Sequence, residues 1–163
     1  MPDTQLRWLW ITLLIVGLDQ AAKLIAEAQL PFHQQVNVIP YFDWYLTYNT
    51  GAAFSFLADA GGWQRWFFAI TSVVISAIIV VWLKKLERDD RITAISLCLI
   101  LGGAIGNLID RIYLGYVIDY IQIWLGTYPW PAFNVADAAI SVGAAILILS
   151  SFISPQNNES PDK

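Results

Sequence analysis

Long apolar runs dominate the chain, and four of them are long enough, or nearly so, to cross a bilayer as helices. Their approximate limits are residues 8–28, 63–83, 92–109 and 132–153. A hydrocarbon layer about 30 Å thick needs roughly 20 apolar residues of helix. The pattern therefore predicts an all-α membrane protein, built as a bundle of four transmembrane helices.

The two long segments between these runs, residues 29–62 and 110–131, are too aromatic to be simple linkers. In YFDWYLTYN, which starts at Tyr41, every second position is apolar or aromatic, and a period of two predicts a strand. The NTG that overlaps its end has the chemistry of a turn. YVIDYIQIW, which starts at Tyr116, has a similar character. We therefore expect a small β-platform on one face of the bundle.

Lysine and arginine are distributed unevenly among the loops. The segment 84–91 holds four of them, whereas residues 29–62 hold none. Because cytoplasmic loops carry the excess of positive charge, both termini and the 84–91 segment are expected in the cytoplasm. The β-platform is then on the outer, periplasmic face. We expect a single membrane domain over residues 1–153, followed by a disordered cytoplasmic tail over 154–163.

The composition agrees with a membrane protein and excludes several other classes. Of the 163 residues, 57% are hydrophobic and only 13% are charged. The net charge of -4 and the lack of a long basic stretch argue against nucleic-acid binding. One cysteine and one histidine exclude an internal disulfide and argue against a Cys/His zinc site. We expect no metal and no cofactor.

Polar residues inside the apolar runs are candidate functional residues, because a charge is costly to bury in a bilayer. Asp19, Lys23 and Glu27 are spaced to share one helix face. A self-neutralising triad with snorkelling side chains would explain them as well as a functional role does. In GGAIGNLIDR, Gly102 and Gly106 form a small-residue stripe that favours close helix packing.

Asn107, Asp110 and Arg111 follow that stripe at the outer end of the third apolar run. An Asp-Arg pair at a membrane interface is unremarkable by itself. The asparagine lies one step deeper, in line with the glycines, so the three residues indicate a polar cluster inside the bundle. We expect this cluster to support the site or to hold substrate.

Two further acids, Asp119 and Asp137, lie in or beside apolar sequence without an adjacent cation. Asn134 is a good N-cap, which places Asp137 at the third helical position, facing the positive end of the helix dipole. Two carboxylates brought together at low dielectric share a proton, so that one acts as general base and the other as general acid. Because the helix terminus favours a charged Asp137, we hypothesise that Asp119 carries the shared proton.

The motifs LDQAAK, YNTGAAFS, GGAIGNLIDR, VIDY and FNVADAAI, in this order, resemble the signature blocks of the lipoprotein signal peptidases (signal peptidase II). The resemblance covers about residues 10–150. It implies a bacterial inner-membrane aspartic peptidase, folded as a four-helix bundle with a periplasmic β-cradle. Such enzymes remove the signal peptide from diacylglyceryl-modified prolipoproteins, cutting just before the lipidated cysteine.

The same resemblance implies roles for individual residues. The catalytic pair falls on Asp119 and Asp137. The substrate-binding or site-supporting residues are Asp19, Lys23, Asn49, Gly51, Asn107, Asp110, Arg111 and Asn134. The implied partners are diacylglyceryl-prolipoproteins and membrane lipid, without a cofactor, and we expect a monomer.

Three alternative hypotheses remain. One keeps the peptidase but uses a Ser55–Lys23 dyad, in which a lysine acts as the base. A second makes the chain a small proton- or ion-coupled transporter that uses the same buried acids as a relay, although neither broken helices nor inverted repeats are visible. A third, a purely structural membrane subunit, does not account for so many polar groups on one side of the bundle.

Overall fold

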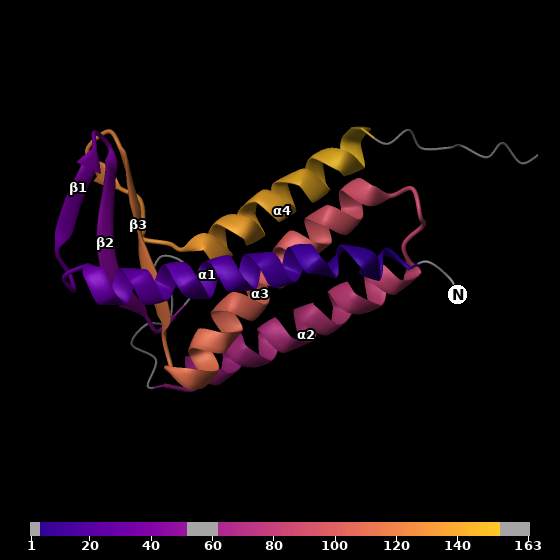
Figure 1. Cartoon of the computed structure of the whole chain (residues 1–163), viewed down its shortest axis with the longest axis horizontal. Coiled ribbons are helices and arrows are strands. Elements are labelled where there is room, and N and C mark those ends of the chain that lie inside the picture. Colours follow the sequence, from indigo (N-terminus) through magenta and orange to yellow (C-terminus); the bar gives the residue numbers. More distant parts are fainter. Residues whose placement is uncertain (1–3, 52–61, 154–163) are drawn as a thin grey trace, which may run out of the picture.

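Four long helices run side by side, and a small sheet stands crosswise at one end of them (Figure 1). The computed structural model of the chain describes residues 4–51 and 62–153. The helices are α1 (Leu9–Gln29), α2 (Trp63–Lys85), α3 (Arg91–Tyr113) and α4 (Val135–Ile153), and a short 3-10 turn, Gln5–Trp8, precedes α1. All four helices are long and apolar enough to cross a membrane, which confirms the predicted bundle.

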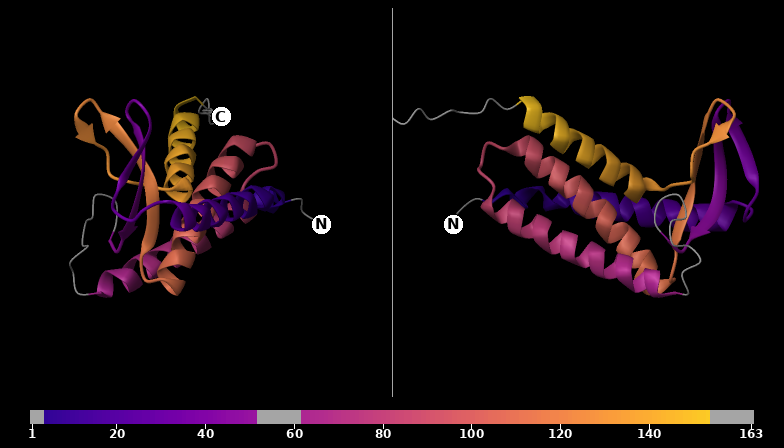
Figure 2. Two further views of the ribbon diagram at one scale, coloured as in Figure 1. Left: turned by 60° about the vertical axis from the view of Figure 1, so that its left-hand side comes forward. Right: turned by 180° about the vertical axis from the view of Figure 1, so that it is seen from behind.

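Helix α3 packs against each of the other three helices, and the right-hand view of Figure 2 shows it between α4 and α2. Its glycines permit this. A Cβ on Gly102 would lie 2.8 Å from the Cβ of Ile15 on α1, and a Cβ on Gly103 would overlap the backbone oxygen of Ala136 on α4. The predicted small-residue stripe is therefore confirmed, and Gly103 extends it toward α4.

The half of the bundle away from the sheet is filled by apolar side chains. We call this cluster the apolar core; its buried members are Ile11, Ile79, Leu83, Ala94, Leu97, Cys98 and Leu101. Because lipid tails are as apolar as these side chains, van der Waals packing rather than escape from water holds them together. One hydrogen bond crosses the cluster, from the Oγ1 of Thr12 to the backbone oxygen of Cys98, at 3.0 Å.

The sheet is antiparallel, with strand order β1-β2-β3-β4. The strands are β1 (Gln35–Ile39), β2 (Phe42–Asn49), β3 (Val117–Leu125) and β4 (Tyr128–Pro129). The predicted strands are confirmed as β2 and β3, whereas β1 was not predicted. A register shift between Trp44 and Thr47 interrupts the expected alternation, so that Asp43 and Leu46 are both buried although they are three residues apart.

The chain passes directly from α3 into β3. The last turn of α3 runs to Tyr113, so residues 110–113, expected in a loop, are helical. The backbone oxygen of Asp110 accepts from the N–H of Leu114 at 2.7 Å and of Gly115 at 3.2 Å. Gly115 has a φ of 91°, which glycine adopts without strain. This tight turn starts β3 beside the end of α3.

The segment before α4 also follows β3. The backbone oxygen of Phe133 accepts from the N–H of Tyr120 at 3.1 Å and of Ile121 at 2.9 Å, and the N–H of Phe133 donates to Ile121 at 3.0 Å. These bonds hold the first turn of α4 against the middle of β3. The sheet end of the bundle thus brings together a helix C-terminus, a helix N-terminus and a strand.

Candidate active site

Asp137 lies in the first turn of α4, where Asn134 caps the helix. The Oδ1 of Asn134 accepts from the N–H of Asp137 at 2.9 Å, and the Oδ2 of Asp137 accepts from the N–H of Asn134 at 3.3 Å. This reciprocal pair is a capping box. The predicted cap and the predicted position of Asp137 are both confirmed, and the cap holds the carboxylate in a fixed orientation.

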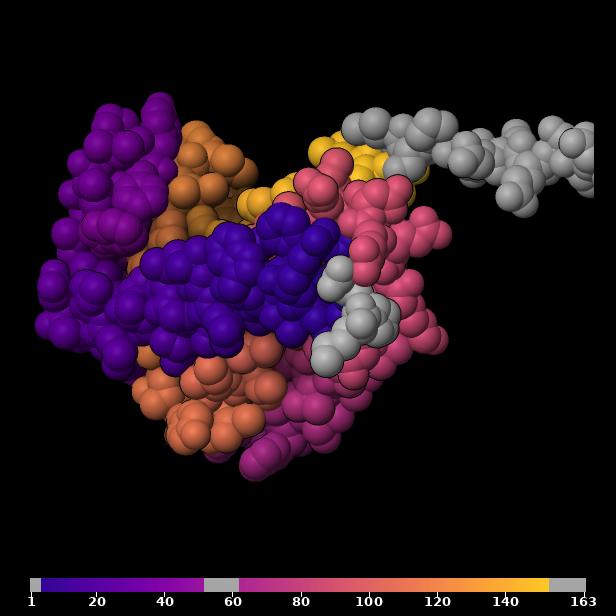
Figure 3. Space-filling view, turned by 45° about the vertical axis from the view of Figure 1, so that its right-hand side comes forward, coloured from indigo at the N-terminus to yellow at the C-terminus, as the bar shows by residue number. Residues whose placement is uncertain are grey.

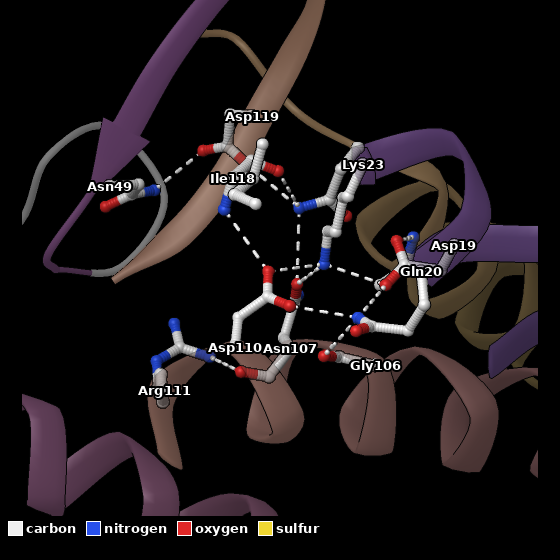
Figure 4. Close-up of polar contacts among 12 residues, drawn as sticks. Asp19, Gln20, Lys23, Asn49, Gly106, Asn107, Asp110, Arg111, Ile118 and Asp119 are labelled. Atoms are coloured by element: carbon white, nitrogen blue, oxygen red, sulfur yellow. Dashed lines mark hydrogen bonds and ion pairs between the residues drawn. The ribbon is translucent and has the colours of Figure 1, made fainter. Parts of the chain in front are cut away.

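Asp119 lies on β3, and side-chain amides donate to both of its oxygens. The Nδ2 of Asn49 donates to Oδ2 at 3.0 Å (Figure 4), and the Nδ2 of Asn134 donates to Oδ1 at 2.8 Å. The Oδ1 of Asn49 accepts from the N–H of Gly51 at 3.0 Å, which is the predicted turn after β2. Asp119 is therefore buried but fully hydrogen-bonded.

Asn107 of α3 connects the two acids. Its Nδ2 donates to the Oδ1 of Asp137 at 2.7 Å, and its Oδ1 accepts from the Nδ2 of Asn134 at 3.2 Å. Since Asn134 also donates to Asp119, the amides of Asn107 and Asn134 form a continuous bridge between the two carboxyl groups. Three separate elements, α3, β3 and α4, thus fix the pair.

Both acids border one cavity of about 550 Å³. Asn49, Asn107 and Arg111 line its polar part. Its apolar wall consists of Val117, Ile123, Trp130, Phe133, Ile140 and Val142. Val142 lies on an exposed part of α4, so the cavity continues toward the lipid-facing side of that helix. Figure 3 shows the notch between the sheet and α4.

A second hollow, of about 410 Å³, reaches Asp119 from the side of the sheet. It is lined by residues of β2 and β3 and shares Asn49, Asp119, Pro131 and Ala132 with the first cavity. Asp119 therefore lies where an apolar cavity along α4 meets a hollow along the sheet.

Burial, and after it the nearby carboxylate of Asp137, raise the pKa of Asp119 to about 7. The hydrogen bonds from Asn49 and Asn134, and the charge of Lys23, oppose the rise in this pKa only in part. Asp119 therefore keeps a proton at a pH where an ordinary aspartate has lost it.

Behind the two acids lies a buried ion-pair triad (Figure 4). The Nζ of Lys23 lies 2.8 Å from the Oδ2 of Asp19 and 2.8 Å from the Oδ2 of Asp110, and it donates to the Oδ1 of Asn107 at 3.1 Å. We call Asp19, Lys23, Asn107, Asp110 and Asn134 the polar core; each is at most 6% exposed.

This arrangement corrects the triad expected on α1. Lys23 pairs with Asp110 of α3 rather than with Glu27, whose Oε1 accepts from the hydroxyl of Tyr48 at 3.0 Å. Of the two explanations considered for this face of α1, snorkelling does not apply to Lys23, because this side chain is only 2% exposed. The reason is tertiary: α3 places an acid in the bundle interior that the sequence of α1 alone does not reveal.

Arg111 connects the end of α3 with the turn after β2. Its Nη1 donates to the backbone oxygen of Asn107 at 3.3 Å and its Nη2 to that of Gly51 at 3.2 Å. Its guanidinium also lies over the ring of Phe68, 5.2 Å from the centroid. The structure therefore brings every expected site residue into one connected cluster, with Gly51 held through Arg111. Ser55 lies outside the described residues.

The sequence matches a family model for signal peptidase (SPase) II over residues 11–153. The chain belongs to the signal peptidase II family. It is 58% identical to a lipoprotein signal peptidase of Pseudomonas syringae pv. tomato, over 98% of both chains. It is 55% identical to one of Pseudomonas putida, over 95% of this chain and 92% of the relative.

The fold agrees with this family. A solved bacterial membrane enzyme superposes with a TM-score of 0.83 at 26% identity, over 96% of this chain and 93% of that one. A second solved bacterial membrane enzyme gives a TM-score of 0.79 at 27% identity, over 91% and 94%. As a signal peptidase II with four apolar helices, the chain is a multi-pass bacterial membrane peptidase.

Two polar residues of this signal peptidase II cluster were not singled out from the sequence. The Nε2 of Gln20 lies 2.9 Å from the Oδ1 of Asp110 and 3.2 Å from the Oδ2 of Asp19. Arg65 of α2 donates to the backbone oxygens of Arg111 and Ile112, both at 2.6 Å. Gln20 is a polar residue inside the first apolar run and Arg65 is one at the start of the second, and that signal was available. Among the described residues, no three acidic, histidine or cysteine side chains gather as metal ligands would.

Proposed function

We propose that the chain is an aspartic endopeptidase in which Asp119 and Asp137 activate a water molecule. The observation that carries this proposal is that both carboxyl groups border one cavity and are bridged by the amides of Asn107 and Asn134. Two acids held this way, one of them with its pKa raised to about 7, match the requirement for one protonated and one ionised partner.

The substrate that fits best is a prolipoprotein whose cysteine carries a diacylglyceryl group. Relatives that are more than half identical are lipoprotein signal peptidases. The apolar wall of the cavity continues to the lipid-facing side of α4, as an apolar signal helix entering from the bilayer requires. The hollow along the sheet offers room for the chain beyond the cut, just before the lipidated cysteine. Membrane lipid surrounds the bundle and takes up the acyl chains.

The chemistry needs no covalent intermediate and no cofactor. Ionised Asp137 takes a proton from the water as its oxygen attacks the scissile carbonyl carbon. Protonated Asp119 gives its proton to the departing nitrogen as the carbon–nitrogen bond breaks. The proton then resides on Asp137 and must return to Asp119 before the next cycle. The ionised carboxylate of Asp137 accepts two hydrogen bonds, from the Nδ2 of Asn107 and from the N–H of Asn134.

The remaining residues of the cluster hold the pair or the substrate. Asn49 fixes Asp119, and Arg111 joins α3 to Gly51 at the rim of the cavity.

We place the sheet end at the periplasmic face of the inner membrane and both termini in the cytoplasm, because the lysines and arginines of 84–91 lie at the opposite end. The catalytic unit is one single-domain chain acting as a monomer, with residues 154–163 as a cytoplasmic tail.

A gel-mobility assay with a lipidated prolipoprotein tests the catalytic pair. Asp119→Asn and Asp137→Asn should each lower the cleavage rate by about 10²–10⁴-fold or more, since each removes one proton-transfer partner. Asp43→Asn is the matched control, because Asp43 is another buried carboxylate, bonded by Asn37 and Trp124 within the sheet. Full activity in either catalytic variant would rule out the pair.

The two main alternatives fit less well. In a Ser55–Lys23 dyad, Lys23 would need a free lone pair, but its two ion pairs and its bond to Asn107 occupy all three ammonium hydrogens. Ser55→Ala should therefore keep most of its activity. Membership of a peptidase family disfavours the transporter; cleavage by purified protein in detergent, without an ion gradient, excludes that alternative.

A further inference from the structure

The carboxylates of the ion-pair triad accept hydrogen bonds from two backbone N–H groups, and each of these N–H groups lies next to one of the two acids in the sequence. The Oδ1 of Asp19 accepts from the N–H of Ala136 at 2.9 Å, and the Oδ2 of Asp110 accepts from the N–H of Ile118 at 3.2 Å. Ala136 immediately precedes Asp137, and Ile118 immediately precedes Asp119. Each carboxylate of the triad thus holds the backbone N–H of the residue directly before one of the two acids that border the cavity.

We propose that Asp19, Lys23 and Asp110 form a positioning device that sets the separation of Asp119 and Asp137. The proposal rests on the catalytic pair proposed above and assigns the triad a role in the rate of the chemical step. None of the three residues borders the cavity, so they act through the backbone and not on the substrate.

The geometry suits a rigid spacer. Lys23 holds Asp19 on its own helix and Asp110 on α3, both at 2.8 Å, and Gln20 lies within hydrogen-bonding distance of both acids. Asp19 is 0% exposed, and Lys23 and Asp110 are each 2% exposed. Buried charges attract each other strongly, and the energy of a buried ion pair depends closely on its distance and orientation. The two ion pairs therefore have little freedom to lengthen, and the side chains have little freedom to rotate.

In each of the two contacts, a carboxylate from another element accepts a hydrogen bond from a backbone N–H. Ala136 is in the first turn of α4, where N–H groups have no partner within the helix, and Asp19 of α1 satisfies this one from outside. Ile118 lies at the start of β3, just after the turn that follows α3, and Asp110 connects this strand to the helix before it. Moving either carboxylate therefore moves one catalytic residue relative to the other.

The carboxylate of Asp19 is closely packed and has no room to move. A Cβ on Gly106 would lie 2.6 Å from the Oδ2 of Asp19 and 3.3 Å from the Cβ of Ala136. The carboxylate is thus wedged between the backbone of α3 and the first turn of α4. A small shift of the carboxylate would be transmitted to the N–H of Ala136, the residue before Asp137.

The experiment compares Asp19→Asn, Asp110→Asn and Gln20→Met in steady-state cleavage of a lipidated prolipoprotein. Each asparagine variant keeps the side-chain size but removes one of the two carboxylate charges that bind Lys23. We expect kcat to fall by about 10²-fold in each, with KM changed less than about threefold, because small misplacements of reacting groups are costly. Gln20→Met leaves both ion pairs in place, and its kcat should fall by about threefold to tenfold.

A second readout separates positioning from folding. A peptide inhibitor with a hydroxyl in place of the scissile carbonyl must contact both acids at once, so its affinity should fall in parallel with kcat. Affinity for a product peptide should remain unchanged. Thermal unfolding reports the folded fraction, and Asp43→Asn is again the matched control. Should an asparagine variant fail to fold, Gln20→Met supplies the same comparison with a milder change.

Three results would overturn the proposal. The first is normal kcat in folded Asp19→Asn and Asp110→Asn protein, or in Gln20→Met where these do not fold. The second is a rise in KM alone. The third is a loss of activity that only matches the loss of folded protein. If Asp119→Asn and Asp137→Asn abolish cleavage while the triad variants do not, the positioning role fails and the catalytic pair stands. If a catalytic variant stays active, the proposed function itself fails.

Discussion

The two ends of the bundle are equally well buried but are held together by different forces. In the apolar core, Leu97 is 1% exposed and Cys98 is 0% exposed. In the polar core, Asn134 is 0% exposed and Lys23 is 2% exposed. Dispersion contacts have shallow, broad minima, so an apolar cluster can adjust to small shifts. Hydrogen bonds and ion pairs lose strength quickly when distances or angles change.

The difference teaches that stability and geometry reside in separate parts of this molecule. The apolar core joins α1, α2 and α3 and leaves their exact positions to packing. The polar core links α1, α3, β3 and α4 through specified atoms. Changes in the first should lower the free energy of unfolding, and changes in the second should lower the catalytic rate.

The largest combined effect, on stability and on activity together, is expected where the two cores meet, at Gly103. A Cβ there would overlap the backbone oxygen of Ala136, so Gly103→Ala must push α4 away from α3. We expect a loss of about 1–3 kcal/mol of stability together with a loss of most cleavage activity. Thermal unfolding and the gel assay measure the two losses. Gly17→Ala is the matched control, because a Cβ on Gly17 meets nothing within 4 Å.

The next comparison tests the division directly with one truncation in each core. Leu97→Ala should lower the free energy of unfolding by about 2–5 kcal/mol while kcat per folded molecule stays unchanged. Asn107→Ala should lower kcat by about 10²-fold or more, because it breaks the bridge between the carboxyl groups. Chemical denaturation and active-enzyme kinetics separate the two. Equal effects of both variants on kcat would contradict the separation of roles.

The pH dependence of cleavage should come from the two acids that the polar core holds, Asp119 and Asp137. Because the pKa of Asp119 is raised to about 7, kcat/KM should fall as the pH rises through about 7, where the general acid loses its proton. A rate profile between pH 5 and 9 measures this limb, which belongs to the two acids as a coupled pair. Asp43→Asn should show the same limb, and a profile that is flat across pH 7 would exclude Asp119 as the acid.

The same raised pKa has an effect on stability with a defined sign. The folded protein keeps a proton on Asp119 that the unfolded chain releases above about pH 4, so folding is favoured more at low pH. The free energy of unfolding should fall as the pH rises from about 4 to about 7, by at most about 4 kcal/mol. Unfolding of Asp119→Asn should lack this decline, whereas Leu97→Ala should retain it.

The smallest effect is expected for a hydroxyl on α2. Among the described residues, the buried Oγ of Ser76 has no hydrogen-bond partner. Ser76→Ala should therefore raise the free energy of unfolding by about 1 kcal/mol, because it removes an unsatisfied polar group. Thr12→Val is the opposite case, since it loses the bond to Cys98 and should be destabilising by about 0.6 kcal/mol. Denaturation curves that rank the two variants the other way would contradict this assignment.

Much of the fold follows from short-range pattern. The length of each apolar run predicts a helix, and the period of two around Trp44 predicts β2, because both signals are contained in one segment. Strand β1 escaped prediction because all five of its residues are exposed and no buried face marks it. Gly103 escaped for a related reason: its role depends on how closely α4 approaches.

The site divides in the same way. Asp137 and its cap at Asn134 are local, so the sequence predicts both correctly. The partner of Lys23 is not local: spacing along α1 favours Glu27, whereas the folded chain supplies Asp110 from α3. Resemblance to the signal peptidases II identified Asp19 and Lys23 as site residues, but only the structure shows which backbone groups they hold.

The side-chain amide of Asn134 has two hydrogens but faces three oxygens. These belong to Asp119 at 2.8 Å, Asn107 at 3.2 Å and the backbone of Ile118 at 3.2 Å. The bond to Asn107 is the one most easily given up, since Lys23 also donates to that oxygen. When Asp119 gains or loses its proton, Asn134 can therefore exchange one acceptor for another by a small rotation of its amide. In the proposed mechanism the negative charge can thus pass from one acid to the other in each cycle with little movement of the surrounding side chains.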